Sequence, residues 1–349
     1  MGDPTPAFCG VGNTIGPVDR GADTRALIEV IQCGQTGPQR ICAGTFATLA
    51  FTTPVQESAL KLHVVDGTFE LYRAHFSKRP GQTSPSGQDV KATVGVIASV
   101  LGLLDDPSES CTHIGVAFDN PIESFRNDMF AGYKTGDGMD PILVDQMDLV
   151  ERAIAACGIV VWRMDQWEAD DALGTAAVRW RNDVEQVRIM TPDKDLGQCV
   201  TGDRVVLVDQ IRKRVINEDG VRERNGVDPE SIPDWLGLVG DTADGIPGLP
   251  GFGAKTAAIL LNRYRAMDNI PDDENTWDVK VRGAPRLGKT LRDNRESARL
   301  FRDLARLALD VPLAESLDDL EWHGARRDDF ESLEEDLGRI RYQPSRWVC

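Results

Sequence analysis

Three apolar runs in this chain each lead directly to an aspartate. They cover residues 62–66, 114–119 and 187–193, and they end on Asp66, Asp119 and Asp193. Short apolar runs of this kind are typical of buried strands in a parallel sheet, and ligands of such sheets bind at the carboxyl ends of the strands. The three carboxylates are therefore expected at one edge of a sheet.

Further acidic residues lie between and after these runs. Glu168, Asp170 and Asp171 form a dense acidic segment, and Asp195 follows Asp193 by two positions. Carboxylates that converge on one edge repel each other unless a cation lies among them. A hard divalent ion such as Mg²⁺ or Mn²⁺, which prefers oxygen ligands, is the simplest such cation. The pattern predicts a metal-dependent enzyme of phosphoryl chemistry.

Each of these acidic residues also has an ordinary structural interpretation. An aspartate at a helix N-terminus is commonly a cap, and one after a strand is commonly a turn residue. That interpretation weakens when all of them must meet at one sheet edge. Asp241 and Asp244 add a further pair three positions apart. So many carboxylates suit two metal ions, which together can activate water and stabilise the leaving oxygen in phosphodiester hydrolysis.

The composition is that of an ordinary globular protein with a buried core. Of 349 residues, 41% are hydrophobic and 27% charged, which allows one large or two modest domains. No apolar stretch is long enough for a membrane span, and the N-terminus does not resemble a secretory signal. Seven cysteines without a Cys-x-x-Cys pair argue against a disulfide framework or a zinc site. We therefore expect a cytoplasmic protein without a membrane partner.

Predicted strands and helices alternate through the first two thirds of the chain. Strands are expected at residues 62–66, 114–119, 159–162, 187–193 and 205–209, and helices near residues 69–73, 90–104, 141–157 and 168–180. This alternation predicts an α/β fold with a mainly parallel sheet, followed by a helical region. The expected division is a poorly ordered extension over residues 1–58, an α/β domain over 59–227, a helical region over 228–325 and a C-terminal tail over 326–349.

A glycine-rich turn and a basic segment indicate a phosphate-bearing partner, although the net charge is −17. Gly248, Gly251 and Gly253 would let backbone N–H groups at a helix start approach a phosphate, and Lys255 adds charge. Residues 281–306 hold eight Lys or Arg residues against three acidic ones. The alternatives are a plain structural turn and a solvated helix face.

Residues 283–290, GAPRLGKT, match the P-loop pattern of nucleotide-binding proteins. A P-loop follows a buried strand, whereas the preceding residues 276–281 are partly charged. We expect Arg286 and Lys289 to contact DNA phosphates instead, and a P-loop NTPase remains an alternative.

Taken in order, these motifs resemble the 5′–3′ exonuclease and flap endonuclease family, which includes the 5′-nuclease domain of bacterial DNA polymerase I and phage 5′-nucleases. They are DGTFELYR at 66–73, FD at 118–119, FR at 125–126, YK at 133–134, EADD at 168–171, DKDL at 193–196 and GDTAD at 240–244. The resemblance runs from about Leu60 to Leu320. It implies a PIN-like domain with a helical arch and a helix-hairpin-helix type DNA clamp, here as a free-standing form.

The resemblance also implies a role for each matching residue. A first metal cluster would contain Asp66, Asp119, Glu168, Asp170 and Asp171, and a second would contain Asp193, Asp195, Asp241 and Asp244. Lys134 would position or polarise the scissile phosphate, Tyr133 would stack on a base near the cut, and Arg73 and Arg126 would lie near phosphates. Gly248, Gly251, Gly253, Lys255 and Thr256 would bind duplex backbone, often with a K⁺ ion held by loop carbonyls.

The predicted function is a structure-dependent 5′–3′ exonuclease or 5′-flap endonuclease that uses two Mg²⁺ or Mn²⁺ ions and binds DNA without sequence preference. Two positions depart from the family pattern. Asp137 occupies a position where the family commonly has arginine, and Gly245 replaces an asparagine. The first departure predicts a shorter, more flexible and less basic arch. The alternatives are a non-catalytic DNA-structure-binding protein, a PIN-type ribonuclease and the P-loop NTPase.

Overall fold

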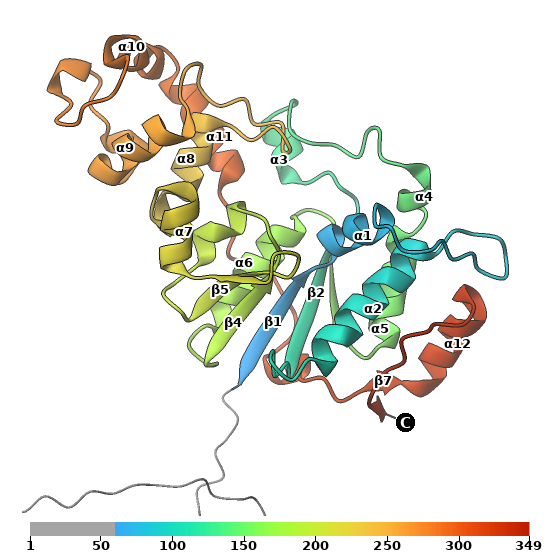
Figure 1. Ribbon diagram of the computed structural model, residues 1–349. Helices are drawn as coiled ribbons and strands as arrows, with labels where there is room; N and C mark the ends of the chain where they lie inside the picture. The colour runs from blue at the N-terminus through green and yellow to red at the C-terminus, as the bar shows by residue number, and fades with distance from the viewer. Residues whose placement is uncertain (1–59, 349) are drawn as a thin grey trace, which may run out of the picture. The chain divides into compact units, whose positions relative to one another are not determined.

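The computed structural model describes residues 60–348, so the extension expected over residues 1–58 lies outside the described part. Its centre is a six-stranded sheet of order β3-β2-β1-β4-β5-β6 (Figure 1). The strands are β1 (Lys61–Asp66), β2 (His113–Asp119), β3 (Val160–Met164), β4 (Gln186–Met190), β5 (Val205–Asp209) and β6 (Arg214–Ile216). Strands β1 to β5 run parallel, and β6 joins the edge antiparallel to β5. The predicted α/β fold with a mainly parallel sheet is confirmed.

Helices cover both faces of this sheet. One core packs the sheet against α1 (Gly67–His75), α2 (Lys91–Asp105), α5 (Met147–Ala156) and α12 (Arg327–Leu337). The other packs it against α6 (Ala169–Trp180) and the helical region. Strand β5 is buried along its whole length, as expected for a strand covered on both faces. The two helical layers are seen on opposite sides of the sheet in Figure 1.

The helical region follows β6 in the chain. It comprises α7 (Glu218–Asn225), α8 (Ile232–Val239), α9 (Ala254–Tyr264), α10 (Ala284–Asp293) and α11 (Arg295–Ala305), with α8 packed on α9 and on α11. Short 3₁₀ turns occur at η1 (Asp195–Cys199), η2 (Pro229–Ser231), η3 (Met267–Asn269), η4 (Glu274–Thr276) and η5 (Asp318–Leu320). Within residues 60–348 no helix is long and apolar enough to cross a membrane.

The helix predicted over residues 141–157 is divided into α4 (Pro141–Val144) and α5. The break lies at Asp145 and Gln146, and the buried Gln146 side chain accepts hydrogen bonds from the N–H and hydroxyl of Thr93 at 3.0 and 3.2 Å. The N–H of Thr93 is an unsatisfied donor of the first turn of α2. Gln146 therefore caps a neighbouring helix at the point where its own helix is interrupted.

The segment expected to form a helical arch contains little helix. Between α3 (Phe125–Met129) and α4, residues 130–140 form turns and bends. Gly138 has a φ of +83°, a conformation that L side chains rarely adopt. Glycines and polar residues in this segment leave it without the apolar stripe that would hold a helix against the core. The structure thus corrects the expectation of a helical arch.

The segment expected as a C-terminal tail is folded over its described residues. Helix α12 packs on α5 and buries Phe330, Leu333 and Leu337. Strand β8 (Trp347–Val348) pairs in parallel with β7 (Ala325–Arg326). The burial of three large apolar side chains on α5 explains why these residues are ordered on the α/β domain.

Candidate active site

The sheet order places β1 between β2 and β4. The chain adds β2 and β3 on one side of β1 and β4 and β5 on its other side, so the order of the strands reverses at β1. This switch point is where parallel sheets form ligand sites. Asp66 ends β1, Asp119 ends β2, and Asp193 follows the end of β4 by three residues. Strand β4 ends at Met190 because the following Pro192 has no N–H for the ladder.

Helix N-termini hold two of these carboxylates in place. Asp66 caps α1 by accepting the N–H of Phe69 at 2.8 Å, and its other oxygen accepts the Thr191 hydroxyl at 3.0 Å. Asp119 accepts the N–H of Ala169, at the start of α6, at 2.6 Å. The helix dipole favours a negative charge at both positions.

Asp66, Asp119, Asp170 and Asp193 form what we call the first carboxylate cluster. Burial, followed by the charges of Asp119 and Asp193, raises the pKa of Asp66 to about 7. Burial and the charges of Asp193 and Asp66 raise the pKa of Asp170 well above its ordinary value. The neighbouring carboxylates thus oppose the ionisation of Asp66 and Asp170, and a bound cation would relieve this excess of negative charge.

Asp195, Asp241 and Asp244 form the second carboxylate cluster. One oxygen from each lies within 4.8 Å of the others, an arrangement that could hold a metal ion. Asp241 and Asp244 are carried on a tight turn after α8, closed by paired backbone hydrogen bonds between Asp241 and Ile246 at 2.8 and 2.7 Å.

The second cluster also contains an unsatisfied polar atom. The buried Asp195 Oδ1 has no hydrogen-bond partner in the described structure, and burial together with Asp193 raises the pKa of this carboxyl well above its ordinary value. A buried oxygen without a hydrogen bond is costly, and the Lys194 ammonium, 3.6 Å away, is too distant to supply one. These hard oxygen donors fit Mg²⁺ or Mn²⁺, which would satisfy the orphaned atom and the excess charge together.

Lys134 lies between Glu168 and the second carboxylate cluster. Its ammonium lies 3.2 Å from Glu168 Oε2 and 3.0 Å from Asp244 Oδ1, and its backbone N–H donates to the Asp244 carbonyl at 3.0 Å. Burial raises the pKa of Glu168, but the neighbouring Lys134 and Arg126 cations lower it further, so this pKa lies below its ordinary value. The Lys134 side chain remains 25% exposed, so it is accessible to a ligand at the clusters.

Lys194 is a site residue that the sequence reasoning did not assign. Its ammonium forms an ion pair with Asp241 and lies 3.6 Å from Asp195 Oδ1. It is thus the counter-ion of the second cluster in the described structure. Its position between Asp193 and Asp195 was the available signal, but a single lysine in a sequence is usually a solvated surface charge.

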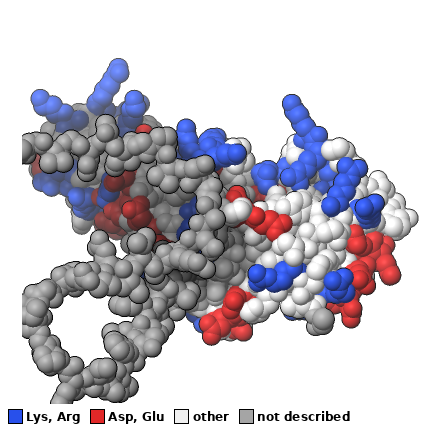
Figure 2. All heavy atoms as spheres, turned by 60° about the horizontal axis from the view of Figure 1, so that its bottom comes forward, with Lys and Arg blue, Asp and Glu red and all other residues white. Residues whose placement is uncertain are grey.

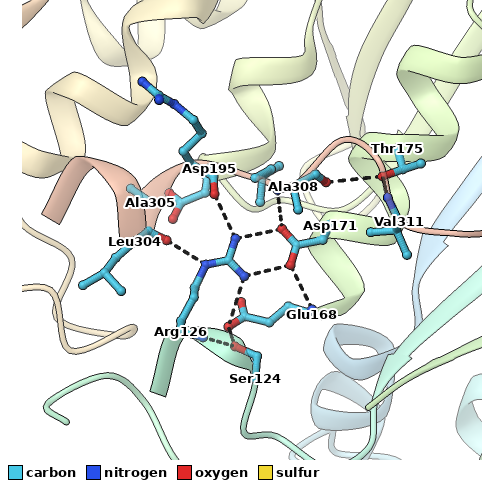
Figure 3. Close-up of polar contacts among 12 residues, drawn as sticks. Ser124, Arg126, Glu168, Asp171, Thr175, Asp195, Leu304, Ala305, Ala308 and Val311 are labelled. Atoms are coloured by element: carbon cyan, nitrogen blue, oxygen red, sulfur yellow. Dashed lines mark hydrogen bonds and ion pairs between the residues drawn. The ribbon is translucent and has the colours of Figure 1, made fainter. Parts of the chain in front are cut away.

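The structure corrects the roles expected for Asp171 and Arg126 (Figure 3). Both are buried, and their side chains form a two-pronged ion pair with both N–O distances at 2.7 Å. Asp171 also accepts the N–H groups of Glu168 and Ala308 at 2.9 and 2.8 Å. With four hydrogen bonds, Asp171 has no free lone pair for a metal, and Arg126 is 1% exposed and cannot reach a phosphate.

This ion pair instead fastens the α/β domain to the end of α11. Arg126 donates to the carbonyls of Leu304 and Arg306 at 2.8 and 2.9 Å. The pair therefore satisfies the carbonyl groups that a helix C-terminus leaves without partners.

Tyr133 and Arg73 are also placed differently from the expectation. Tyr133 is 4% exposed and donates its hydroxyl to Glu168 Oε2 at 3.2 Å, so its ring is not available to stack on a base. Arg73 pairs with Glu70 on the preceding turn of α1 and donates to Ser99 at 2.7 Å. Its guanidinium binds these groups rather than either carboxylate cluster.

The glycine-rich turn lies between α8 and α9, as expected for a helix-hairpin-helix clamp. Gly248 and Gly251 have φ values of +66° and +90°, which explains why glycine is required at both positions. Gly253 precedes α9 without a side-chain cap, and Lys255 and Thr256 follow in its first turn. Arg286 lies beside Gly251, 3.0 Å from the position that a Cβ atom there would occupy.

The P-loop alternative is wrong. Residues 284–290 lie within α10, and the described residues 277–283 directly before this helix form bends and turns rather than a strand, so there is no phosphate-binding loop. Lys289 forms an ion pair with Asp293 one turn further along the same helix.

Ion pairs also neutralise much of the basic segment, residues 281–306. Arg292, Arg295 and Arg299 lie 2.7, 2.8 and 2.7 Å from Glu274, Asp272 and Asp268, respectively. These three arginines therefore bind an acidic loop of the helical region, and the free charges nearest the glycine turn are Lys255 and Arg286.

Comparison with known proteins identifies the family. The model of the 5′–3′ exonuclease N-terminal resolvase-like domain matches residues 61–226, and that of the C-terminal SAM fold of the same enzymes matches residues 227–328. The chain belongs to the 5′–3′ exonuclease family. The resemblance inferred from the motifs is thereby confirmed. Members of this family are metal-dependent hydrolases of DNA.

Relatives with assigned names lead to the same family. The 5′–3′ exonuclease of Aquifex aeolicus is 31% identical over 281 residues, which are 80% of this chain and 91% of that protein. DNA polymerase I of Bacillus caldotenax is 34% identical over 284 residues, and that of Pseudomonas aeruginosa is 36% identical over 272. These cover 80% and 75% of this chain but only 31% and 29% of the polymerases, so the chain spans about a third of their length.

Solved structures share the fold. A zinc-bound bacteriophage T5 5′-exonuclease has a TM-score of 0.57 at 18% identity, covering 79% of this chain and 99% of the other. The catalytic core of Rad2 in complex with DNA substrate has a TM-score of 0.52 at 15% identity, covering 80% and 88%. At this level of identity the likeness establishes the fold.

Proposed function

We propose that this protein is a structure-dependent 5′–3′ exonuclease and 5′-flap endonuclease that hydrolyses DNA phosphodiesters with two divalent metal ions. The observation that carries the proposal is the pair of adjacent carboxylate clusters at the switch point of the sheet. The raised pKa values of Asp66, Asp170 and Asp195 and the Asp195 oxygen without a hydrogen bond indicate sites built for cations.

The first carboxylate cluster, with Asp66, Asp119, Asp170 and Asp193, would hold one ion, and the second, with Asp195, Asp241 and Asp244, would hold the other. Glu168 lies between them but is already bonded to Ser124, Tyr133 and Lys134, so it positions Lys134. When bound, such ions activate water and stabilise the leaving oxygen. Mg²⁺ and Mn²⁺ both suit carboxylate ligands.

Lys134 would orient the scissile phosphate. Its ammonium is held between Glu168 and Asp244, beside the second carboxylate cluster, and its side chain is partly exposed. A cation fixed beside the reacting phosphate offsets the charge that develops there during hydrolysis.

DNA would be bound through its backbone, without sequence preference. The uncapped start of α9, with Gly253, Lys255 and Thr256, presents N–H groups and a positive charge to a duplex phosphate, and Arg286 lies beside the same turn. A K⁺ ion at the carbonyls of the glycine turn is part of this proposal. Binding of this kind weakens steeply with salt.

We also propose a cytoplasmic location. It follows from the DNA substrate, and it agrees with the unpaired thiols of Cys111, Cys157 and Cys199.

The test is cleavage and binding of a labelled 5′-flap DNA by the wild type and by Asp170→Asn and Asp193→Asn. The wild type should cut with Mg²⁺ and not with a chelator, and each variant should lose at least about a thousandfold in rate while binding the DNA. The exposed Asp183→Asn serves as a matched control that should cut normally. Full activity in Asp170→Asn or Asp193→Asn would refute the metal assignment.

A non-catalytic DNA-structure-binding protein is the second candidate, because residues 130–140 do not form the helical arch that the resemblance implied. It predicts binding of flap DNA with no cleavage at any Mg²⁺ or Mn²⁺ concentration. An RNA flap in the same assay tests for a ribonuclease.

A further inference from the structure

A groove with an unusual charge lies apart from the carboxylate clusters. It has a volume of about 890 Å³ and is formed by residues 79–83, the first turns of α2 and residues 337–342. In Figure 1 these elements come together on the right, where the loop before α2 approaches the end of α12. Its cationic side chains are Arg79, Lys91, Arg339 and Arg341, and no Asp or Glu is among its described lining residues.

The charges of this groove are not neutralised, in contrast to those of the basic segment. Arg79 donates to the Gly95 carbonyl at 3.0 Å, and Lys91 donates to the carbonyls of His75 and Ser77 at 2.7 and 2.8 Å. Neutral carbonyls therefore hold these two cations in place without removing their charge. Arg339 and Arg341 are exposed, and over residues 60–348 neither forms an ion pair.

Two carboxylates lie beside the groove, since Asp89 accepts the N–H of Lys91 at 2.9 Å and Asp105 accepts the Tyr342 hydroxyl. Arg339 and Arg341 also line a neighbouring cavity that contains glutamates. Glu331, Glu334 and Glu335 of α12 line an adjoining cavity, and Glu334 accepts the N–H of Ile340 at 3.0 Å. On the face drawn in Figure 2, Lys and Arg side chains gather at the upper right, and side chains of both charges are mixed below them. In a chain of net charge −17, four cations with no Asp or Glu among the described lining residues form a local site for a polyanion.

The floor of the groove is apolar and has an aromatic ring at its edge. Val94, Ala98 and Leu337 line it, and Tyr342 is 37% exposed with its hydroxyl donated to Asp105 at 3.0 Å. Cations that follow a backbone, combined with an aromatic surface for bases, are typical of single-strand binding sites. A duplex hides the faces of its bases, so this floor favours an unpaired strand.

Helix α1 connects the groove to the carboxylate clusters. It begins after Asp66 and ends at His75, whose carbonyl binds Lys91 of the groove. Nine residues of helix span roughly 14 Å at about 1.5 Å per residue. A strand leaving the clusters could therefore reach the groove within a few nucleotides.

We propose that this groove binds the unpaired DNA strand adjacent to the cleavage site. The proposal rests on the proposed function for the identity of the substrate. One side of the groove, with Arg339, Arg341 and Tyr342, lies beyond residue 328, where the family match ends. The other side, with Arg79 and Lys91, lies within the matched N-terminal domain, so the groove combines a family element with a segment outside the family match.

Binding in the presence of a chelator tests the proposal without cleavage. Fluorescence anisotropy would compare a labelled single-stranded oligonucleotide with a blunt hairpin duplex for the wild-type chain and Arg339→Ala/Arg341→Ala. The variant should bind the single strand about tenfold more weakly, with a salt slope reduced by roughly 1.4, since each single-strand phosphate contact contributes about 0.7. Hairpin affinity should stay within about twofold of the wild type.

Three further variants of the chain serve as controls. Arg212→Ala/Arg214→Ala removes two charges at the β5–β6 edge and should bind the single strand like the wild type. Tyr342→Ala should weaken single-strand binding about fivefold or more without changing the salt slope, because it removes stacking and no charge. Arg339→Lys/Arg341→Lys keeps the charges and should retain the wild-type salt slope.

An unchanged single-strand affinity in Arg339→Ala/Arg341→Ala, or an equal loss on the hairpin, would overturn the proposal. So would binding to vesicles of phosphatidylserine and phosphatidylcholine that depends on these arginines when oligonucleotide binding does not. If the wild type binds the single strand through these residues but never cuts DNA, the nuclease proposal fails and the groove proposal stands.

Discussion

At the scale of single residues, adjacent acidic residues of one motif have different tasks. Asp170 and Asp171 follow each other at the start of α6, yet Asp170 faces the first carboxylate cluster and Asp171 binds Arg126. The helix turns by about 100° per residue, so neighbours in the sequence point to different surroundings. A motif identifies the segment, and the environment of each side chain decides its role.

Two substitutions separate these tasks. Asp171→Asn should lower the free energy of unfolding by about 3–5 kcal/mol, because it leaves the Arg126 charge buried without its partner. Asp170→Asn should keep or raise the stability of the metal-free protein, because it removes a charge that repels Asp66 and Asp193. Urea denaturation of both variants in a chelator measures the difference. Equal destabilisation of the two would contradict it.

Lys194 competes with the second metal ion in this account. Lys194→Gln removes the counter-ion of Asp241 and Asp195, so the variant should bind Mn²⁺ up to about tenfold more tightly, equivalent to about 1.4 kcal/mol. Isothermal titration calorimetry without DNA measures this affinity, and the exposed Lys213→Gln should not change it. Weaker Mn²⁺ binding by Lys194→Gln would show that the ammonium instead orders the carboxylates.

At the scale of elements, two glycines of the turn between α8 and α9 have different roles, one in folding and one in DNA binding. A Cβ atom on Gly248 would lie 2.4 Å from backbone atoms of Val239 and Gly240, whereas one on Gly253 would meet nothing within 4 Å. Gly248 is therefore needed for the close approach of α8 to the turn, and Gly253 leaves open space in front of α9.

Alanine at each position should reveal this difference. Gly248→Ala should lower the melting temperature by several degrees, because the chain must shift to avoid the clash and because φ is positive there. Gly253→Ala should leave the melting temperature unchanged but weaken duplex binding several-fold, because its methyl group obstructs a phosphate. Differential scanning calorimetry and anisotropy with a hairpin duplex distinguish them. Unchanged duplex affinity in Gly253→Ala would remove the turn from the DNA interface.

The sequence predicted strands β1 to β5 and the sheet class because short-range patterns determine them, but it did not predict the short edge strand β6 or the β7–β8 pair. It did not predict the Arg126–Asp171 pair, whose other contacts involve Leu304, 178 positions away. Nor did it predict that Tyr133 is buried, since that depends on its contact with Glu168 from another element. The folded C-terminal segment was missed for the same reason: Phe330 and Leu333 are apolar residues whose partners lie on α5.

At the scale of the whole molecule, the carboxylate clusters link stability to pH and metal. The folded-state pKa of Asp66 is about 7, above its unfolded value of about 4, and the pKa values of Asp170 and Asp195 are raised as well. Between these values the folded state holds more protons than the unfolded state. These groups therefore make the metal-free protein less stable as the pH rises from about 4 to about 7.

Bound metal should offset this loss, so the rise in melting temperature caused by Mg²⁺ should be larger near pH 8 than near pH 5.5. At low pH the carboxyl groups are protonated and bind the ion poorly. Thermal unfolding at both pH values, with and without the same Mg²⁺ concentration, measures the difference. The Asp170→Asn variant should show a smaller rise at the higher pH. A rise that is equal at both pH values would contradict this linkage.

The most direct test of the central claim is the initial rate of 5′-flap cleavage by the wild-type chain as a function of Mg²⁺ concentration. Two ions bound by the two clusters predict no cleavage in a chelator and a rate that rises with a Hill coefficient above one before it saturates. Cleavage that persists in the chelator, or no cleavage at any Mg²⁺ or Mn²⁺ concentration, would contradict it.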